Sequence, residues 1–391
     1  MGILSPLIVI SSLSLTNFRS YAAVNLEVPE TPLVFLVGPN GAGKTNLLEA
    51  LSLLGGGRGL RRAPVHDLTK IGSAGDPAWV INAELSKPPL RHKISQALTA
   101  EGRLTRLDQK TTTGTHLGRL IPTVCLTPVE DSLFRGPPED RRALLDRFVM
   151  AMYPDHRTQL SAYNKSLRER NALLRQALRD GTPPNAAWLT GLEQLMATHG
   201  VALAHQRRVY LASLASAVAQ GLGPFPAAAL GLQGEMEADL QDQEAGDVEL
   251  NWATRWQRER GADLSAGRTL HGPHRTDLSV MFRAKHMPAA QCSTGEQKAL
   301  LLSLFLGQAR LLNAAHIRPL LLLDEVAAHL DADRRATLME ELAGLGAQTW
   351  ITGTDRQALM AQKIEDKSTV FTLQNASVAL SNSMIYPSIR L

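Results

Sequence analysis

Cysteine is scarce in this chain. Its 391 residues include two cysteines, Cys125 and Cys292, which lie far apart and form no Cys-x-x-Cys pair. Their spacing excludes a disulfide framework and argues against a cysteine-based zinc site. Such cysteine usage is typical of a reducing compartment, so we expect a cytoplasmic protein.

Long hydrophobic runs are also missing. The longest apolar stretches, at 299–306 and 320–323, fall well short of the roughly 20 residues needed to cross a bilayer. The N-terminus has no basic segment followed by an apolar stretch and a small-residue cleavage site. We therefore expect no membrane span, no signal peptide and no membrane partner.

No charge of one sign dominates. Lysine and arginine number 41 against 37 acidic residues, which gives a net charge of +4 and a pI near 9.1. This mild basicity permits an anionic partner such as nucleic acid without requiring one. With 44% hydrophobic residues, the chain is long enough to bury a full core and an accessory unit.

The first part of the sequence has the pattern of short strands. Apolar and polar residues alternate through 8–36, which predicts two strands around Asn17 and then a buried strand over 33–37. A glycine cluster follows, and we expect a helix from about Gly43 to Leu54. The segment 80–117 predicts further short strands and polar loops.

From Glu139 the pattern becomes helical. Two series of apolar residues at helical spacing flank a Gly-Thr-Pro-Pro break at 181–184, which predicts two antiparallel helices. At about 35 residues each they would be near 50 Å long. They could pack flat on a globular core or project as an arm. All charged side chains within 235–249 are acidic, so we expect a solvated connector there.

The last third alternates again between strands and helices. We expect a strand near 278–283, a helix after Ser293, a strand over 320–323, a helix after Asp331 and a strand over 349–352. The tail after 375 is rich in serine and asparagine, and we expect it to be loosely held.

The strongest chemical signal is a glycine-rich loop between a strand and a helix. It fits the phosphate-binding pattern G-x-x-x-x-G-K-[ST] and consists of Gly38, Pro39, Asn40, Gly41, Ala42, Gly43, Lys44 and Thr45. Glycines let successive backbone N–H groups face an anion, and the helix N-terminus adds partial positive charge. In such loops the lysine neutralises the β- and γ-phosphates and the Thr hydroxyl ligates Mg²⁺.

A second signal is the apolar strand at 320–323, which ends in Asp324 and Glu325. Ligand sites in α/β sheets lie at this end of the strands. We expect Asp324 to hold Mg²⁺ and Glu325 to orient or deprotonate an attacking water.

A third signal is the Cys-Ser-Thr-Gly-Glu-Gln stretch at 292–297. By itself it is a helix N-cap, and helix N-termini can also bind phosphate.

Together these elements resemble ATP-binding-cassette (ABC) ATPases of the SMC type. More narrowly, the chain resembles the RecF family of bacterial DNA replication and repair proteins over about residues 13–355. Four segments carry that resemblance: 15–21, 137–146 with its Arg141-Arg142 pair, 167–174 with Arg170-Asn171, and the His-Gly-Pro-His-Arg-Thr-Asp-Leu stretch at 271–278.

The resemblance implies an α/β ABC-type P-loop ATPase head with a helical second domain. We expect a head lobe over 1–138, a helical arm or insert over 139–255, a second head lobe over 256–372 and a tail over 373–391.

Family members are expected to dimerise on ATP, with each nucleotide held between the P-loop of one subunit and the signature of the other. On that basis Ser293 and Gly295 touch the γ-phosphate in trans, Arg19 lies near the nucleotide, and Asp331 lies at the dimer seam. Compared with the transporter form of the signature, Thr294 replaces the first glycine and Cys292 replaces a leucine.

The resemblance also implies ATP and Mg²⁺ as ligands and weak ATPase activity that acts as a switch. It suggests DNA as partner, at single-strand gaps or junctions, together with a RecR-type mediator and a role in SOS induction. No compact DNA-binding motif is present. The candidate basic contacts are Arg58, Arg61, Arg62, Arg141, Arg142, Arg168, Arg170 and Arg175.

Several competing interpretations are less well supported. A metal site at His271, His274 and Asp277 has loose spacing and no cysteine partner. A transporter ATPase subunit would have a much shorter distance between P-loop and signature, and an SMC-type structural protein needs far longer coiled coils. A nuclease of the overcoming-lysogenisation-defect type would need an acidic nuclease domain, which we do not recognise.

Overall fold

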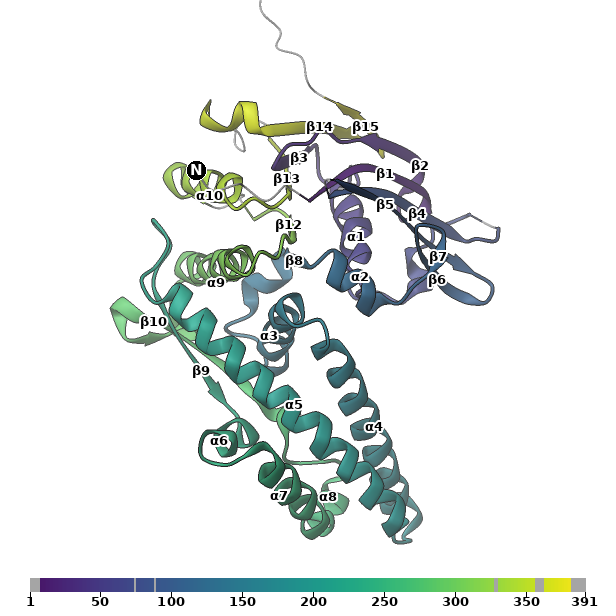
Figure 1. The fold of residues 1–391 in the computed structure, drawn as a ribbon, viewed down its shortest axis with the longest axis vertical. Helices are drawn as coiled ribbons and strands as arrows, with labels where there is room; N and C mark the ends of the chain where they lie inside the picture. The colour runs from purple at the N-terminus through teal and green to yellow at the C-terminus, as the bar shows by residue number, and fades with distance from the viewer. Residues whose placement is uncertain (1–7, 74, 88, 327–329, 356–361, 381–391) are drawn as a thin grey trace, which may run out of the picture. The chain divides into compact units, whose positions relative to one another are not determined.

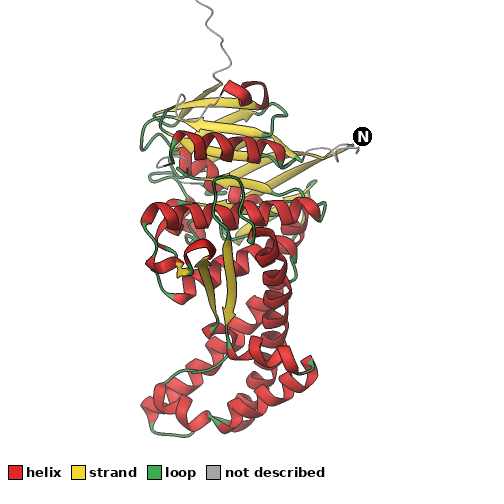
Figure 2. Ribbon diagram, turned by 90° about the vertical axis from the view of Figure 1, so that its left-hand side faces the viewer, coloured by secondary structure: helices red, strands yellow, loops and turns green. Residues whose placement is uncertain are grey.

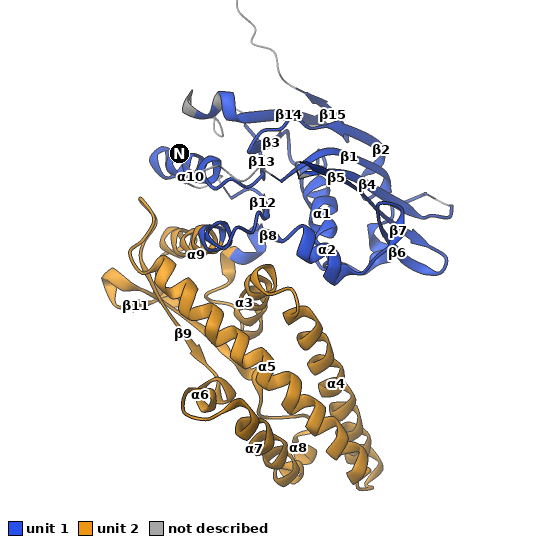
Figure 3. Ribbon diagram, in the orientation of Figure 1, with its two compact units in different colours: residues 1–130, 309–391 blue, residues 131–308 orange. Residues whose placement is uncertain are grey.

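The computed structural model describes residues 8–73, 75–87, 89–326, 330–355 and 362–380. It divides into two compact units, one formed by 1–130 with 309–391 and the other by 131–308 (Figure 3). The sequence-based boundaries at 138, 255 and 372 place the division differently, and they remain a prediction. The end of the tail, 381–391, lies outside the described residues.

Unit 1 contains an antiparallel sheet built from the N-terminal strands (Figure 1). Its order is β2-β1-β4-β5-β6-β7. The strands are β1 (Val9–Phe18), β2 (Tyr21–Glu27), β4 (Trp79–Lys87), β5 (Leu90–Thr99), β6 (Gly102–Leu107) and β7 (Lys110–Thr111). Alternate side chains of β1, including Leu13 and Leu15, are buried, as expected for a sheet with one covered face.

A second, mostly parallel sheet in unit 1 has the order β15-β14-β3-β13-β12-β8. It consists of β3 (Leu33–Val37), β8 (Thr123–Leu126), β12 (Leu320–Leu323), β13 (Thr349–Gly353), β14 (Ser368–Gln374) and the antiparallel edge strand β15 (Ser377–Leu380). All residues of β3, β12 and β13 are buried, which is typical of parallel strands covered on both faces.

Helix α1 (Lys44–Leu54) shares one hydrophobic core with both sheets, because Leu47, Leu48 and Leu51 cluster with residues of β1, β4, β12 and β13. Its C-terminal end is tied to the antiparallel sheet: the Leu53 carbonyl accepts from Gln96 Nε2 at 2.9 Å and from an Arg103 guanidinium nitrogen at 3.3 Å. The remaining helical elements of unit 1 are η1 (Val65–Leu68), α2 (Gly114–Leu120), η2 (Pro128–Ser132, whose end lies in unit 2), α10 (Ala332–Gly344) and η6 (Gln362–Lys367).

Unit 2 is largely helical, with the small sheet β11-β10-β9 among its helices (Figure 2). Its elements are α3 (Pro138–Met152), α4 (His156–Asp180), α5 (Ala186–Val218), β9 (Ala228–Gln233), α6 (Glu235–Asp242), α7 (Ala245–Arg258), α8 (Arg260–Ala266), η3 (Pro273–Arg275), β10 (Asp277–Phe282), η4 (Arg283–Lys285), β11 (Met287–Pro288) and η5 (Ala289–Gln291). Helix α9 (Thr294–Ala314) begins in unit 2 and ends in unit 1.

The predicted antiparallel helices are α4 and α5, with Asn185 as the N-cap of α5 through a bond from the Trp188 N–H. Helix α5 has 33 residues, close to expectation, but α4 has only 25. The helical pattern that begins at Glu139 is interrupted at Tyr153–Asp155, where Pro154 separates α3 from α4.

The expectation of an acidic connector over 235–249 is wrong, because α6 and the beginning of α7 occupy this stretch. Met236 and Leu240 in α6, and Val248, Trp252 and Trp256 in α7, recur at four-residue spacing and are buried. The acidic side chains suit the first turn of α6, where they face the helix dipole.

Across these described ranges, no helix combines the length and the apolar character needed to cross a bilayer.

Candidate functional site

The glycine-rich loop lies where β3 of the parallel sheet meets α1, as the sequence predicts. Gly43 has a φ of 102° and packs so closely that an added Cβ would lie 2.4 Å from the Tyr21 hydroxyl oxygen. At Gly38 an added Cβ would lie 2.3 Å from the Leu373 carbonyl oxygen. A side chain at Gly38 would therefore collide with the backbone of β14, and one at Gly43 would be strained at this φ and would collide with the Tyr21 ring.

Lys44 is held inside this loop. Its Nζ donates to the carbonyl oxygens of Gly38 at 2.7 Å and Pro39 at 3.0 Å, and its residue is 4% exposed. Burial lowers the pKa of Lys44, while the nearby carboxylates of Glu325 and Asp324 act in the opposite direction. The ammonium is thus positioned at the loop, close to the two acidic residues that follow β12.

Asp324 joins the loop to the end of the parallel sheet. Its Oδ1 accepts from the Thr45 hydroxyl at 3.0 Å and from the Thr352 hydroxyl at 2.8 Å. This hydroxyl and carboxylate pair consists of oxygen donors of the kind that Mg²⁺ prefers. Thr45 and Asp324, which the sequence proposed as metal ligands, are therefore brought together.

Thr352 was not among the predicted site residues. Its hydroxyl accepts from the Glu325 backbone N–H at 2.8 Å while it donates to Asp324. One side chain on β13 thus fixes both acidic residues at the end of β12. The available signal was the position of Thr352 at the C-terminal end of a predicted strand, where α/β sheets place ligands.

Glu325 adopts a left-handed backbone conformation with a φ of 53°. Within the described ranges its carboxylate has no hydrogen-bond partner. Non-glycine residues in this region carry backbone strain, which is enriched at functional sites. The strained backbone at the end of β12 marks this position as a candidate functional residue.

Arg19 is anchored beside the first turns of α1. Its Nε and one terminal nitrogen each donate to Glu49 at 2.8 Å, and its other terminal nitrogen donates to the Asp67 carbonyl at 2.8 Å. The neighbouring Ser20 hydroxyl accepts from Asn46 Nδ2 at 2.9 Å. The β1–β2 turn is therefore fastened to the helix that follows the loop. Glu49 was missed, because a glutamate inside an apolar helix has no local motif.

Tyr21 provides a test of whether the loop suits a phosphate-bearing ligand. Its side chain is buried, and its hydroxyl, next to Gly43, has no hydrogen-bond partner within the described residues. Burial raises the pKa of Tyr21, so the phenol stays protonated and able to donate. An unsatisfied buried donor therefore lies against the backbone of the phosphate-binding loop, and loops of this kind bind anions through their N–H groups.

The signature residues Ser293 and Gly295 lie in unit 2, at the start of α9. Ser293 forms a capping box with Glu296: the Ser293 hydroxyl and N–H each donate to Glu296 Oε2 at 2.9 Å. The ion pair with Lys285 and the bonds from Ser293 lower the pKa of Glu296 to about 2. An added Cβ at Gly295 would meet nothing within 4 Å, so this part of the turn is open.

Asp331 caps helix α10. Its side chain accepts from the Arg334 backbone N–H at 2.8 Å. This role is complete within one chain, and the expected place of Asp331 at a dimer seam remains a prediction.

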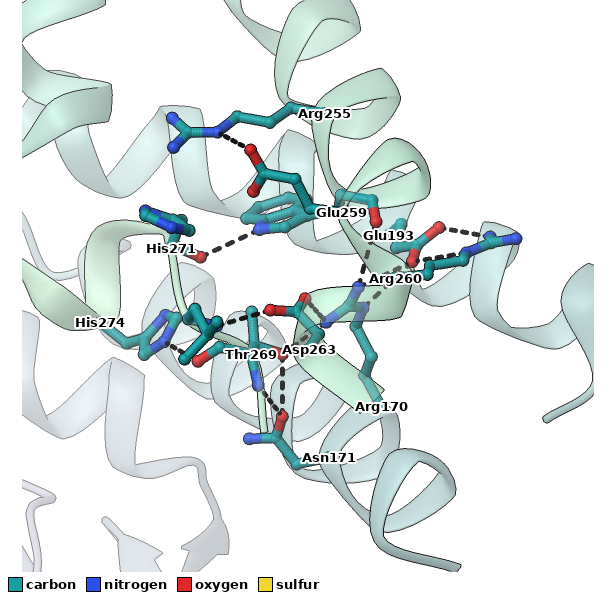
Figure 4. A network of polar contacts seen from close by, with 12 residues as sticks. Arg170, Asn171, Glu193, Arg255, Glu259, Arg260, Asp263, Thr269, His271 and His274 are labelled. Carbon is teal, nitrogen blue, oxygen red and sulfur yellow. Dashed lines mark hydrogen bonds and ion pairs between the residues drawn. The ribbon is translucent and has the colours of Figure 1, made fainter. Parts of the chain in front are cut away.

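The His271-His274-Asp277 spacing does not bring its three side chains onto one centre. His271 Nδ1 pairs with Glu235 at 2.9 Å, and His274 Nδ1 bonds to the Tyr163 hydroxyl at 2.7 Å. Asp277 forms a two-pronged pair with Arg141 at 2.7 and 2.8 Å. His271 and His274 lie apart in the segment that leads to β10 (Figure 4), and Asp277 is the first residue of that strand.

The structure also sorts the candidate DNA contacts. Arg170 is wrong as a DNA contact, because it is fully buried and bonds to Glu193, Asp263 and Thr269 (Figure 4). Arg141 is engaged by Asp277. The candidates that are exposed are Arg58, Arg61, Arg62, Arg168 and Arg175.

Comparisons with known proteins decide the family. The family described as "RecF/RecN/SMC N terminal domain" matches residues 9–378. The DNA replication and repair protein RecF of Mesorhizobium japonicum is 42% identical over 377 residues, covering 94% of this chain and 97% of the relative. The chain belongs to the RecF family. The RecF protein of Caulobacter vibrioides is 44% identical, with 88% and 91% coverage.

Solved structures agree with this RecF-family fold. The recombination mediator protein RecF with ATP, from the RecFOR pathway, has a TM-score of 0.81 at 22% identity, covering 96% of this chain and 98% of that chain. An SMC head domain from Pyrococcus furiosus has a TM-score of 0.54 at 15% identity, covering 95% and 96%. The expected ABC-type head fold is thereby confirmed.

Proposed function

We propose that this RecF-family chain is an ATP-dependent DNA-binding protein of recombinational repair and replication restart. The observation that carries the proposal is the convergence of Lys44, Thr45 and Asp324 where β3 and β12 end. Relatives more than 40% identical over most of the chain are named DNA replication and repair proteins, which supports the biological setting.

The residues of the loop have distinct roles in this proposal. The backbone N–H groups of Gly41, Gly43, Lys44 and Thr45, together with the Lys44 ammonium, bind the phosphates of ATP. Thr45 and Asp324 hold Mg²⁺, which when bound offsets phosphate charge. Thr352 keeps Asp324 in place, and Glu325 orients a water and accepts its proton.

ATP also acts as a dimerisation ligand. Ser293 and Gly295 of a second copy complete the phosphate site, which requires the Ser293 hydroxyl to turn from Glu296 toward the nucleotide. Arg19 lies close to the nucleotide, and Asp331 lies at the dimer seam. Binding that occurs only in the dimer shifts the monomer–dimer equilibrium by mass action, and slow hydrolysis reverses the shift.

The dimer binds DNA at single-strand gaps or junctions. A RecR-type mediator joins it there, and this binding contributes to SOS induction. The exposed arginines supply phosphate contacts, so DNA affinity falls steeply as salt concentration rises.

Sedimentation with and without ATP and Mg²⁺ tests the dimer switch. We expect a monomer without nucleotide and a dimer with it. Lys44→Ala abolishes nucleotide binding, whereas the exposed Lys110→Ala, which removes the same charge, binds normally. Glu325→Gln traps the dimer by slowing hydrolysis, and Glu101→Gln serves as its control. An unchanged monomer in wild type under both conditions would refute the proposal.

DNA titrations then test the preferred partner. Wild type is titrated with gapped, duplex and single-stranded oligonucleotides in the presence of ATP, ADP or neither. We expect the tightest binding to gapped DNA with ATP. Equal affinity in all nucleotide states would exclude ATP as the switch.

A further inference from the structure

Glu49 is a buried acidic side chain shared by two arginines. It lies on α1, one turn beyond Thr45, and is fully buried. Its Oε2 accepts from Arg19 Nε at 2.8 Å and from an Arg61 terminal nitrogen at 3.1 Å, and its Oε1 accepts from Arg19 at 2.8 Å. One carboxylate therefore sets the orientation of two guanidinium groups.

The two arginines differ in exposure. The Arg19 side chain is 19% exposed and the Arg61 side chain 42%. One terminal nitrogen of Arg61 donates both to Glu49 and to the Asn46 side-chain oxygen, and its distance to the Asn46 oxygen is 3.0 Å. Its guanidinium thus keeps donors directed to solvent, in a loop that also carries the exposed Arg58 and Arg62.

Arg19 keeps donors as well. Glu49 and the Asp67 carbonyl use three of its five N–H groups, and the other two, on the terminal nitrogens, have no partner in the part of the chain that the structure describes. Its neighbours Ser20 and Tyr21 contact Asn46 and Gly43 at the start of α1. A fork of two N–H groups beside the phosphate-binding loop suits a phosphate oxygen.

We propose that Glu49 is a positioning residue that couples a nucleic-acid backbone phosphate bound at Arg61 to Arg19 at the nucleotide. The inference rests on the proposed function and adds a route by which DNA changes ATP affinity. Arg19, Glu49 and Arg61 all lie in unit 1, so this coupling requires no rearrangement of unit 2.

The direction of the effect follows from the shared oxygen. A phosphate that binds Arg61 competes with Glu49 for its guanidinium and draws it outward. Glu49 Oε2 then has Arg19 as its remaining partner, and the two-pronged pair with Arg19 tightens. Because a fixed guanidinium loses less freedom on binding, ATP binds more tightly when DNA is present. By linkage, ATP tightens DNA binding by the same factor.

The test measures this coupling as a ratio. The dissociation constant of a fluorescent, slowly hydrolysed ATP analogue is determined by anisotropy, without DNA and with a saturating gapped oligonucleotide. We expect DNA to lower the constant of wild type about fivefold, within the usual range of coupling between sites.

Three variants assign the coupling to its residues. Arg61→Ala lowers the ratio to near one. Glu49→Gln does the same, because the oxygen of the amide can accept a hydrogen bond but its nitrogen cannot, so the side chain no longer binds both guanidinium groups. Arg91→Ala removes the same charge as Arg61→Ala from an exposed position on β5 and keeps the fivefold ratio. Arg61 is half exposed, so its variant remains informative even if Glu49→Gln folds poorly.

The outcomes separate the inference from the proposed function. If wild type binds both ligands but the ratio is one, or if Arg61→Ala keeps it, the inference is overturned and the proposed function stands. If Glu49→Gln weakens ATP equally with and without DNA, its role is structural alone and the inference also fails. A wild type that binds neither ligand refutes the proposed function and the inference together.

Discussion

Protonation of His274 should destabilise unit 2 as the pH falls. Its Nδ1 accepts from the Tyr163 hydroxyl and its Nε2 donates to the Thr269 carbonyl at 3.3 Å, an arrangement that only the neutral ring satisfies. Burial, opposed by the Thr269 bond and reinforced by Arg275, Arg142 and Arg207, lowers the pKa of His274 from 6.5 to about 4.

The sign follows from proton uptake. Between pH 6.5 and 4 the unfolded chain binds a proton at this position that the folded chain excludes, so stability is full above pH 6.5 and falls toward pH 4. At about 1.4 kcal/mol per pH unit the whole effect is about 3 kcal/mol, of which about 2.5 kcal/mol is lost by pH 4.5.

The assay is urea unfolding followed by tryptophan fluorescence at pH 7.5, 5.5 and 4.5, for wild type and His274→Gln. Glutamine can accept from Tyr163 and donate to Thr269 but does not titrate. The difference in unfolding free energy between the two proteins isolates this residue, because other titrating groups are common to both. We expect wild type to lose about 2.5 kcal/mol relative to the variant between pH 7.5 and 4.5. A difference that stays constant with pH would refute the reasoning.

Three further variants test other parts of the structure. Tyr21→Phe removes a buried hydroxyl without a described partner, and we expect thermal unfolding to show stabilisation of about 1 kcal/mol; a destabilised variant would show that the hydroxyl is satisfied in solution. Arg170→Met removes positive charge that compensates the buried carboxylates of Glu193 and Asp263. Urea unfolding should show a decrease of about 3–5 kcal/mol in the free energy of unfolding, whereas a decrease below about 1 kcal/mol would contradict the network. Glu296→Gln weakens the capping box, so amide exchange in the first turn of α9 should be faster in hydrogen-exchange measurements, and the difference from wild type should shrink as the pH falls from 4.5 toward 2; unchanged exchange at neutral pH would exclude the cap.

Strands and motifs that are continuous in the sequence were predictable. The strands over Leu33–Val37 and Leu320–Leu323 are uniformly apolar and end in chemically distinctive residues, and the structure confirms their bounds. The helix after the phosphate-binding loop was predictable because the glycine cluster before it and its own apolar residues are also continuous in the sequence.

The contacts that were missed join residues far apart in the chain. Glu49 meets Arg19 from 30 positions away, and Thr352 meets Asp324 from 28 positions away. No local pattern records such pairs. The prediction for the stretch that forms α6 was wrong for a different reason. It rested on the acidic charge of the stretch and did not use the four-residue spacing of Met236 and Leu240, which indicates a helix.

Helix α1 is fixed at both of its ends. Its first turn continues the loop that encloses Lys44, and its last carbonyl groups include that of Leu53, which receives side chains from β5 and β6. Both ends of the helix are therefore held by contacts outside the helix. A displacement of the loop would therefore reach β5 and β6 through the Leu53 carbonyl and would not be lost at a frayed helix end.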